Sequence, residues 1–151
     1  MSPKTFIERC SSPDQAGWLE LRLALWPDAT DEEHRSYMAN LLAQPDRYLQ
    51  LMMYDEQRQP LGFIEGSIRT DYVNGTESSP VGFIEGVYVV PAGRRKGVAR
   101  QLYAAIADWA KARGCRELAS DALIDNEVSQ RAHRSLGFRE TERVVYFKKD
   151  L

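Results

Sequence analysis

A basic, glycine-containing turn is the clearest chemical feature of the sequence. It reads Gly93-Arg94-Arg95-Lys96-Gly97-Val98-Ala99 and lies between a mostly apolar run and a segment of helical periodicity. In such a turn, backbone N–H groups converge on an anion, the start of the following helix adds partial positive charge, and the basic side chains add full charges. The glycine spacing is neither that of the dinucleotide fingerprint nor that of the Walker loop. The turn predicts a pyrophosphate site, and a solvated basic helix start is the alternative.

Carboxylates occur where a sheet normally carries apolar side chains. Glu85 lies inside an apolar run, Asp121 ends another, and Glu142 precedes the last predicted strand. A period of two puts Glu85 on the same face as Val87 and Val89 unless a bulge intervenes. Buried charges require partners, so each carboxylate faces either an internal arginine or a cationic ligand. The three together favour a cationic ligand.

Two aromatic residues extend this acidic set. Trp26 follows a helical apolar stripe directly before Pro27, and packing in the core is its alternative role. Tyr72 opens a loop rich in polar and turn-forming residues, where core packing is harder to argue. An aromatic face beside carboxylates suits a sugar that carries several ammonium groups, because the ring stacks and the ammoniums pair.

Alternating elements must position these residues. Apolar periodicity and turn signals predict strands at residues 4–9, 48–54, 61–69, 81–90, 118–123 and 144–147. Capping signals and apolar stripes predict helices at residues 12–26, 30–42, 97–113 and 125–136. The expected caps include Ser12, a capping box of Thr30 with Glu33, and Asp125. The sequence Gly-Phe-Ile-Glu-Gly occurs at 62–66 and again at 82–86, which we interpret as two neighbouring strands of similar sequence. The order predicts a mixed α/β (α+β) sheet with helices on both faces.

Composition excludes several classes of protein. A chain of 151 residues with 43% hydrophobic and 28% charged residues is typical of one globular domain, 1–151. A net charge of −2 argues against generic nucleic-acid binding. The absence of a long apolar run or an apolar leader predicts no membrane span and a cytoplasmic protein. The two cysteines match neither a disulfide framework nor a metal site.

The basic turn fits Arg-x-x-Gly-x-Ala and resembles the acetyl-CoA loop of the GCN5-related N-acetyltransferase (GNAT) superfamily. A second mark is Asn126, followed by Leu136-Gly137-Phe138. The resemblance implies the GNAT acyl-CoA N-acyltransferase fold, with a central, mostly antiparallel sheet that is splayed at the middle. It also implies acetyl-CoA as co-substrate, no metal, and donor-site contacts from Val87, Tyr88, Val89, Arg94, Arg95, Lys96, Gly97, Val98, Ala99 and Asn126.

The chain departs from this family at one position. Many members carry a tyrosine four residues before the final Gly-Phe pair, and His133 stands there in this sequence. An imidazolium can donate a proton to a leaving thiolate, whereas an exposed helix histidine with no catalytic role is the alternative. A thiolate with a pKa near 8.5 also leaves without much help, so water is the second candidate for the general acid.

Longer stretches are similar to a narrower family, the aminoglycoside 6'-N-acetyltransferases of Gram-negative bacteria. They are residues 71–83, 117–121 and 136–146, and the likeness extends from about Trp18 to Lys148. The resemblance implies a homodimer, a role in antibiotic resistance, and acceptors of the kanamycin, tobramycin and amikacin class. It implies acceptor contacts from Trp26, Tyr72, Glu85, Asp121 and Glu142.

These expectations combine into direct acetyl transfer within a ternary complex. Asp121 takes a proton from the 6'-ammonium, Glu85 helps to hold the amine, and the N–H of Val87 stabilises the developing oxyanion. One alternative is a GNAT acetyltransferase for another polycationic amine, such as a polyamine or a protein N-terminus. A non-catalytic CoA-binding sensor is the alternative from a different class.

Overall fold

A mixed five-stranded sheet forms the centre of the molecule. The computed structural model describes residues 4–151. Its strands follow one another in chain order: β1 (Thr5–Arg9), β2 (Tyr48–Asp55), β3 (Pro60–Arg69), β4 (Val81–Val89) and β5 (Leu118–Ala119). The first four pair antiparallel, and β5 runs parallel to β4. The predicted mixed and mostly antiparallel sheet is confirmed.

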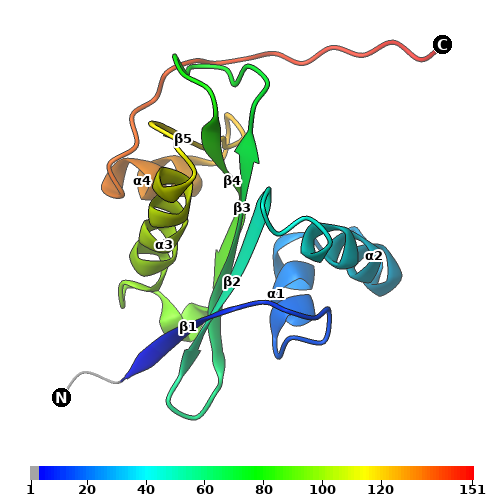
Figure 1. The fold of residues 1–151 in the computed structure, drawn as a ribbon, viewed down its shortest axis with the longest axis vertical. Helices are drawn as coiled ribbons and strands as arrows, with labels where there is room; N and C mark the ends of the chain where they lie inside the picture. Colours follow the sequence, from blue (N-terminus) through cyan, green and yellow to red (C-terminus); the bar gives the residue numbers. More distant parts are fainter. Residues whose placement is uncertain (1–3) are drawn as a thin grey trace.

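Helices cover both faces of this sheet, as predicted (Figure 1). On one face lie α1 (Trp18–Leu25) and α2 (Asp31–Leu42), and on the other lie α3 (Val98–Ala112) and α4 (Glu127–Ser135). Each face has its own apolar core, one around Trp18 and Met38 and the other around Leu102 and Ile106. No helix of residues 4–151 combines the length and the apolar character that crossing a bilayer requires.

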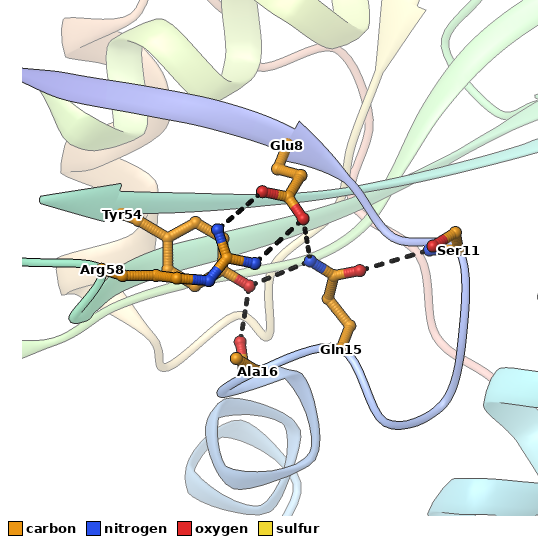
Figure 2. Close-up of polar contacts among 6 residues, drawn as sticks. All are labelled: Glu8, Ser11, Gln15, Ala16, Tyr54 and Arg58. Atoms are coloured by element: carbon orange, nitrogen blue, oxygen red, sulfur yellow. Dashed lines mark hydrogen bonds and ion pairs between the residues drawn. The ribbon is translucent and has the colours of Figure 1, made fainter.

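The start of α1 differs from the prediction, because residues 12–17 form turns rather than a helix. Side-chain contacts hold this segment against the sheet (Figure 2). The amide of Gln15 donates to Glu8 at 2.8 Å and to the hydroxyl of Tyr54 at 3.1 Å, and that hydroxyl donates to the carbonyl of Ala16 at 2.6 Å. Gly17 then takes a φ of 82°, which the capping pattern at Ser12 does not reveal, and the helix begins after it.

The other helices begin close to the predicted positions. The capping box of α2 is formed by Thr30 and Glu33 as expected, and α3 begins after Gly97. The cap of α4 is Asn126 rather than Asp125, since the Asn126 side chain accepts the N–H of Ser129 at 3.1 Å. The repeated Gly-Phe-Ile-Glu-Gly sequence lies on the paired strands β3 and β4, which confirms its interpretation as two similar neighbours.

Strands β4 and β5 separate soon after they meet. Only two residue pairs join them, Gly82 with Leu118 and Phe83 with Ala119, so β5 is shorter than the predicted strand 118–123. Beyond Phe83, β4 is paired on its β3 side alone. The splay expected of the sheet is therefore present, and it leaves backbone N–H and C=O groups along one edge of β4 without a strand partner.

The predicted final strand, residues 144–147, is not formed within the chain. The segment after α4 carries no secondary structure, and it leaves the body as an extended tail (Figure 1). Val145, Tyr146 and Phe147 are 75%, 85% and 92% exposed. The prediction of a strand here is therefore wrong for the single chain. A strand needs a neighbour for its backbone groups, and none of the strands within residues 4–151 pairs with this segment.

Candidate active site

The basic turn and the start of α3 combine basic side chains with backbone N–H groups that are free for a ligand. Arg95 and Gly97 take positive φ values of 63° and 78°, which turns successive backbone N–H groups toward one side. No side chain caps the first turn of α3, so its N–H groups remain available to a ligand. Arg94 donates to the carbonyl of Val89 at 3.1 Å, which ties the turn to the end of β4.

The free edge of β4 leads directly to this turn. Val87, Tyr88 and Val89 pair with β3 on one side and have no strand on the other. Val87 and Val89 pack toward α3, and Tyr88 packs toward α1. A pantetheine arm can hydrogen-bond along such an edge while its pyrophosphate lies at the helix start. The side-chain oxygen of Asn126 accepts the N–H of Ser129 in the cap of α4, and its amide N–H groups remain free for a ligand.

A bulge changes the orientation predicted for Glu85. The register shifts between β3 and β4, so that Glu65 faces Gly86 while Gly66 faces Ile84, and Glu85 is the extra residue. Glu85 consequently lies on the α1 and α2 face, opposite to Val87. A strict period of two put both on one face, and the bulge is the physical reason for the difference.

Glu85 has partners within the protein. Arg69 donates to its two carboxylate oxygens at 2.7 and 2.9 Å, and the hydroxyl of Ser67 donates to it at 2.9 Å. The sequence left open whether an arginine of the protein pairs with Glu85, and Arg69 is that partner. The Glu85 side chain nevertheless stays 25% exposed, so part of it still faces a cavity.

That cavity has a volume of about 360 Å³ and lies between α1, α2 and the sheet. Trp26 and Tyr37 contribute aromatic surface to it, and Glu33 and Glu85 contribute carboxylates. Burial, followed by the negative charges of Glu85 and Glu65, raises the pKa of Tyr37. The cavity thus combines aromatic rings with negative potential, which is the environment that an ammonium-bearing sugar requires.

A larger hollow of about 780 Å³ contains the remaining three predicted acceptor residues. Tyr72 is 73% exposed there, Asp121 lies exposed just beyond β5, and Glu142 comes from the tail. The amide of Asn74 donates to Glu142 at 3.2 Å. Both volumes fall within or near the range of about 300–1,000 Å³ that is usual for small-molecule sites.

The five predicted acceptor residues are therefore divided between two hollows. Trp26 and Glu85 line the smaller, whereas Tyr72, Asp121 and Glu142 line the larger. The two are joined by the Arg69–Glu85 ion pair, because Arg69 lines the larger hollow and its partner lines the smaller. The structure brings the residues to adjoining spaces rather than into a single closed pocket.

His133 lies on α4 and bridges to the strand that precedes Asp121. Its Nδ1 is 2.7 Å from the carbonyl oxygen of Ser129, so this nitrogen carries a proton and donates it. Its Nε2 is 2.7 Å from the hydroxyl of Ser120, which donates to it when the ring is neutral. Tyr103 and Phe138 pack edge-on against the imidazole. In this arrangement a neutral His133 is an acceptor at Nε2.

Neither cysteine is a candidate nucleophile, and the described residues form no metal site. Burial raises the pKa of the Cys10 thiol and of the Cys115 thiol, which keeps both protonated. Among residues 4–151, no three side chains of the His, Cys, Asp or Glu type are grouped as a metal ion would need.

Sequence reasoning missed several polar residues behind the smaller cavity. They are Arg22, His34 and Glu65, and all three are almost fully buried. It also missed Arg69, which lines the larger hollow and pairs with Glu85. One signal was available, since Glu65 occupies the same place in the first Gly-Phe-Ile-Glu-Gly sequence as Glu85 does in the second. The rule that singled out Glu85, a carboxylate inside an apolar strand, applies equally to Glu65.

Comparison with known sequences places this site in a family. Residues 16–138 match the model of the Acetyltransferase (GNAT) family. The chain is 52% identical over 136 residues to the aminoglycoside N(6')-acetyltransferase type 1 of Acinetobacter genomosp. 13, an alignment covering 90% of this chain and 92% of that protein. It is 51% identical over 146 residues to the enzyme of the same name from Acinetobacter haemolyticus, covering 96% and 98% of the two chains.

Solved structures agree with this placement. The aminoglycoside antibiotic 6'-N-acetyltransferase AAC(6')-Ih from Acinetobacter baumannii superposes with a TM-score of 0.93 at 46% identity, covering 98% of this chain and 99% of that one. The complex of AAC(6')-Iy with a bisubstrate analogue, CoA-S-monomethyl-acetylneamine, superposes with a TM-score of 0.92 at 40% identity and the same coverage. The chain therefore belongs to the acetyltransferase (GNAT) family and, within it, to the aminoglycoside N(6')-acetyltransferases.

Proposed function

We propose that this protein transfers the acetyl group of acetyl-CoA to the 6'-amino group of an aminoglycoside by direct attack, and thereby confers resistance to these antibiotics. One observation carries the proposal. The basic, uncapped start of α3 follows β4, and the same strand contributes Phe83 to the larger hollow and Glu85 to the smaller one, both of which contain carboxylates and aromatic rings. The relatives' names and the bisubstrate complex of AAC(6')-Iy support the same reaction.

The donor half of the site fits a nucleotide-tailed thioester. The basic turn, with Arg94, Arg95, Lys96, Gly97, Val98 and Ala99, would hold the pyrophosphate at the uncapped start of α3. The edge of β4 from Val87 to Val89 would pair with the pantetheine arm, and the free amide of Asn126 would add a further contact. Bound acetyl-CoA supplies an activated acetyl group at a thioester.

The acceptor half would hold the sugar and remove a proton from it. The rings of Trp26 and Tyr72 stack on sugar surfaces, and Glu85 and Glu142 pair with ammonium groups. Asp121 lies exposed at the edge of the larger hollow, so it can take the proton of the 6'-ammonium directly or through water. A positioned base contributes roughly 10²–10⁴-fold to a rate.

The N–H of Val87 would stabilise the negative charge that develops on the thioester oxygen. One such donor contributes about 2.7–4 kcal/mol in other enzymes. For the leaving group we favour water as the proton donor, because Nε2 of His133 already accepts from Ser120 in the neutral ring. With a pKa near 8.5, the thiolate leaves with little acid assistance.

A thiol-release assay with matched acceptors tests the proposal. We expect CoA release with tobramycin and kanamycin, and none with an aminoglycoside that carries a 6'-hydroxyl in place of the 6'-amine. Equal release with both kinds of acceptor, or with spermidine and an N-terminal peptide instead, would point to the alternative of a broader amine acetyltransferase. CoA binding without release for any amine would identify a sensor.

We also propose a cytoplasmic homodimer built from one 151-residue domain per subunit, in which residues 144–147 pair with the partner copy. The segment is apolar, rich in β-branched and aromatic residues, and unpaired within its own chain. Leaving Tyr146 and Phe147 in water costs several kcal/mol that burial would recover, at roughly 1.5–3 kcal/mol for each large side chain.

The oligomeric state is measured by light scattering on the full chain. We expect a dimer, and we expect a monomer when Tyr146→Asp and Phe147→Asp are combined. Val128→Asp on α4 is the matched control, because Val128 is also exposed but lies outside the tail. A wild-type monomer, or a dimer that survives both tail substitutions, would rule out this mode of assembly.

A further inference from the structure

Three polar side chains meet in the interior beneath α1, on the wall of the smaller cavity. Arg22 of α1, His34 of α2 and Glu65 of β3 are only 4%, 2% and 2% exposed. Arg22 forms an ion pair with Glu65, and the indole N–H of Trp18 donates to the same carboxylate at 2.9 Å. The positive and negative charges therefore cancel within the interior, as buried charges must.

The hydrogen bonds of His34 define which of its ring nitrogens carries the proton. Nε of Arg22 donates to Nδ1 of His34 at 3.1 Å, and a guanidinium can only donate. Nδ1 is therefore the acceptor, and the ring proton sits on Nε2, which donates to the carbonyl oxygen of Trp26 at 3.0 Å. His34 thus links the buried ion pair to the backbone at the C-terminal end of α1.

The hydrogen bond from His34 reaches the backbone of Trp26, and neighbouring residues pack around the Trp26 side chain. The Arg22 guanidinium lies 4.7 Å from its ring centroid, and Phe63 packs edge-on against it at 6.1 Å. The indole also covers Gly86 of β4 so closely that a Cβ atom there would be 2.4 Å from Cη2 of the indole. The remaining surface of the indole lines the cavity together with Glu85.

Tyr37 completes the arrangement from α2. Its ring centroid lies 5.0 Å from the same guanidinium, so Arg22 contacts both Trp26 and Tyr37. His34 and Tyr37 are three residues apart on α2 and share one side of that helix. The orientation of Arg22 thereby sets the position of both rings in the cavity.

We infer that His34 is a positioning residue for the acceptor, acting through Arg22 and the Trp26 carbonyl to hold the indole wall of the cavity. The inference rests on the proposed function, and it gives a role to His34, a residue that the proposed catalytic mechanism does not use. A purely structural role does not require these groups, because replacing buried polar networks by well-packed apolar residues is often neutral or stabilising.

Steady-state kinetics on His34→Ala, His34→Gln and Leu41→Ala test the inference. We expect His34→Ala to raise the KM for tobramycin about tenfold, which corresponds to the loss of one to two net hydrogen bonds. The KM for acetyl-CoA and kcat should stay within about twofold. His34→Gln should recover most of the effect, because its amide both accepts and donates.

Leu41→Ala is the matched control for a loosened helix. Leu41 is buried in the apolar core on α2 and does not line the smaller cavity, so its truncation should lower the Tm without raising the KM for tobramycin. If Leu41→Ala raises that KM as much as His34→Ala does, the effect is one of stability and the inference is wrong.

A double-mutant cycle with Trp26→Ala identifies the route of the effect. If His34 acts through Trp26, His34→Ala should have little further effect on the KM once the indole is absent. Additive effects would overturn the inference while leaving the proposed function intact. A wild-type protein that releases no CoA with any 6'-amino aminoglycoside would instead overturn the proposed function, and this inference with it.

Discussion

Each predicted acceptor carboxylate meets a different environment in the structure. Glu85 is paired with Arg69, Glu142 accepts from Asn74, and Asp121 lies exposed in the larger hollow. These differences separate the roles that the sequence alone left similar. A carboxylate held by an arginine is suited to orient an amine, whereas an exposed carboxylate can exchange a proton with water.

The first prediction concerns Asp121. Asp121→Asn should lower kcat/KM for tobramycin at least tenfold, because the amide cannot accept the proton that the ammonium must lose. The affinity for acetyl-CoA, measured by calorimetry, should be unchanged. Turnover equal to the wild type would remove Asp121 from the mechanism.

The second prediction concerns Glu142. Glu142→Gln should raise the KM for tobramycin more than it lowers kcat, since the tail carboxylate pairs with an ammonium away from the reacting amine. Asn74→Ala removes the neutral partner of Glu142 and leaves the charge, so its effect on the KM should be the smaller of the two. The opposite pattern, a fall in kcat at constant KM, would contradict a binding role.

At the residue scale, the sequence identified residues whose type is unusual among their neighbours along the chain. It missed residues whose importance appears only from their contacts in the folded protein. Glu85, Asp121 and Tyr72 are unusual for their surroundings along the chain. Arg22 looks like an ordinary helix arginine, and only packing between α1, α2 and β3 reveals it as a buried cation.

At the element scale, the start of α3 is the proposed donor site. Apolar residues at spacings of three and four, including Leu102, Ile106 and Ala110, bury one side of the helix and fix its axis against the sheet. This packing aims the uncapped first turn at the end of β4. The anion site thus depends on the helix as a whole.

The third prediction tests this site. Arg94→Ala should weaken CoA binding, and the loss should be larger at low salt because screening reduces the contribution of a surface charge. Arg113→Ala is the control, since it removes the same charge at the opposite end of α3. An equal loss of affinity in the two variants would show that only net charge matters.

A second element-scale device attaches the segment before α1 to the sheet (Figure 2). Arg58 donates to both oxygens of Glu8 at 2.9 and 3.1 Å, and Gln15 donates to one of them. The hydrogen bonds from Arg58 and then Gln15 lower the pKa of Glu8 to about 2. A carboxyl whose pKa is lowered by folding stabilises the protein above its ordinary pKa and loses that effect as the pH falls toward the folded value.

The fourth prediction follows from that sign. Glu8→Gln should lower the Tm by roughly 1–3 °C at pH 7, and the difference from the wild type should shrink as the pH falls from 4.5 toward 2. Asp108→Asn, which removes an exposed carboxylate on α3, should give little difference at either pH. A difference for Glu8→Gln that is constant across the pH range would contradict the ion-pair account.

Local sequence signals predicted most elements, and the failures share a physical cause. Capping boxes and apolar stripes are local, so α2 and α3 were placed well. The turn before α1 and the short β5 depend on partners distant in sequence, and the segment 144–147 carries β-forming residues but has no strand partner within residues 4–151. Propensity alone cannot report such partners.

At the scale of the whole molecule, the basic turn and the predicted acceptor residues lie at different places along β4. The basic turn lies at one end of β4, near η1 (Pro91–Gly93), and the carboxylates and aromatic rings gather around the α1 and α2 face and the hollow beyond β5. A thioester lying along the free edge of β4 would reach from one region toward the other. The spatial relation of the two regions is thus a property of the fold, and it was predictable from sequence only as two unlinked sets of residues.

The most direct test of this account is the position of the acetyl group on the product, determined by NMR of tobramycin after turnover with acetyl-CoA. We predict a single acetyl group, on the 6'-nitrogen, because the two hollows orient the polycationic sugar before attack. Acetylation at another amine, or a mixture of positions, would contradict the claim that the residues lining the two hollows select the 6'-amine.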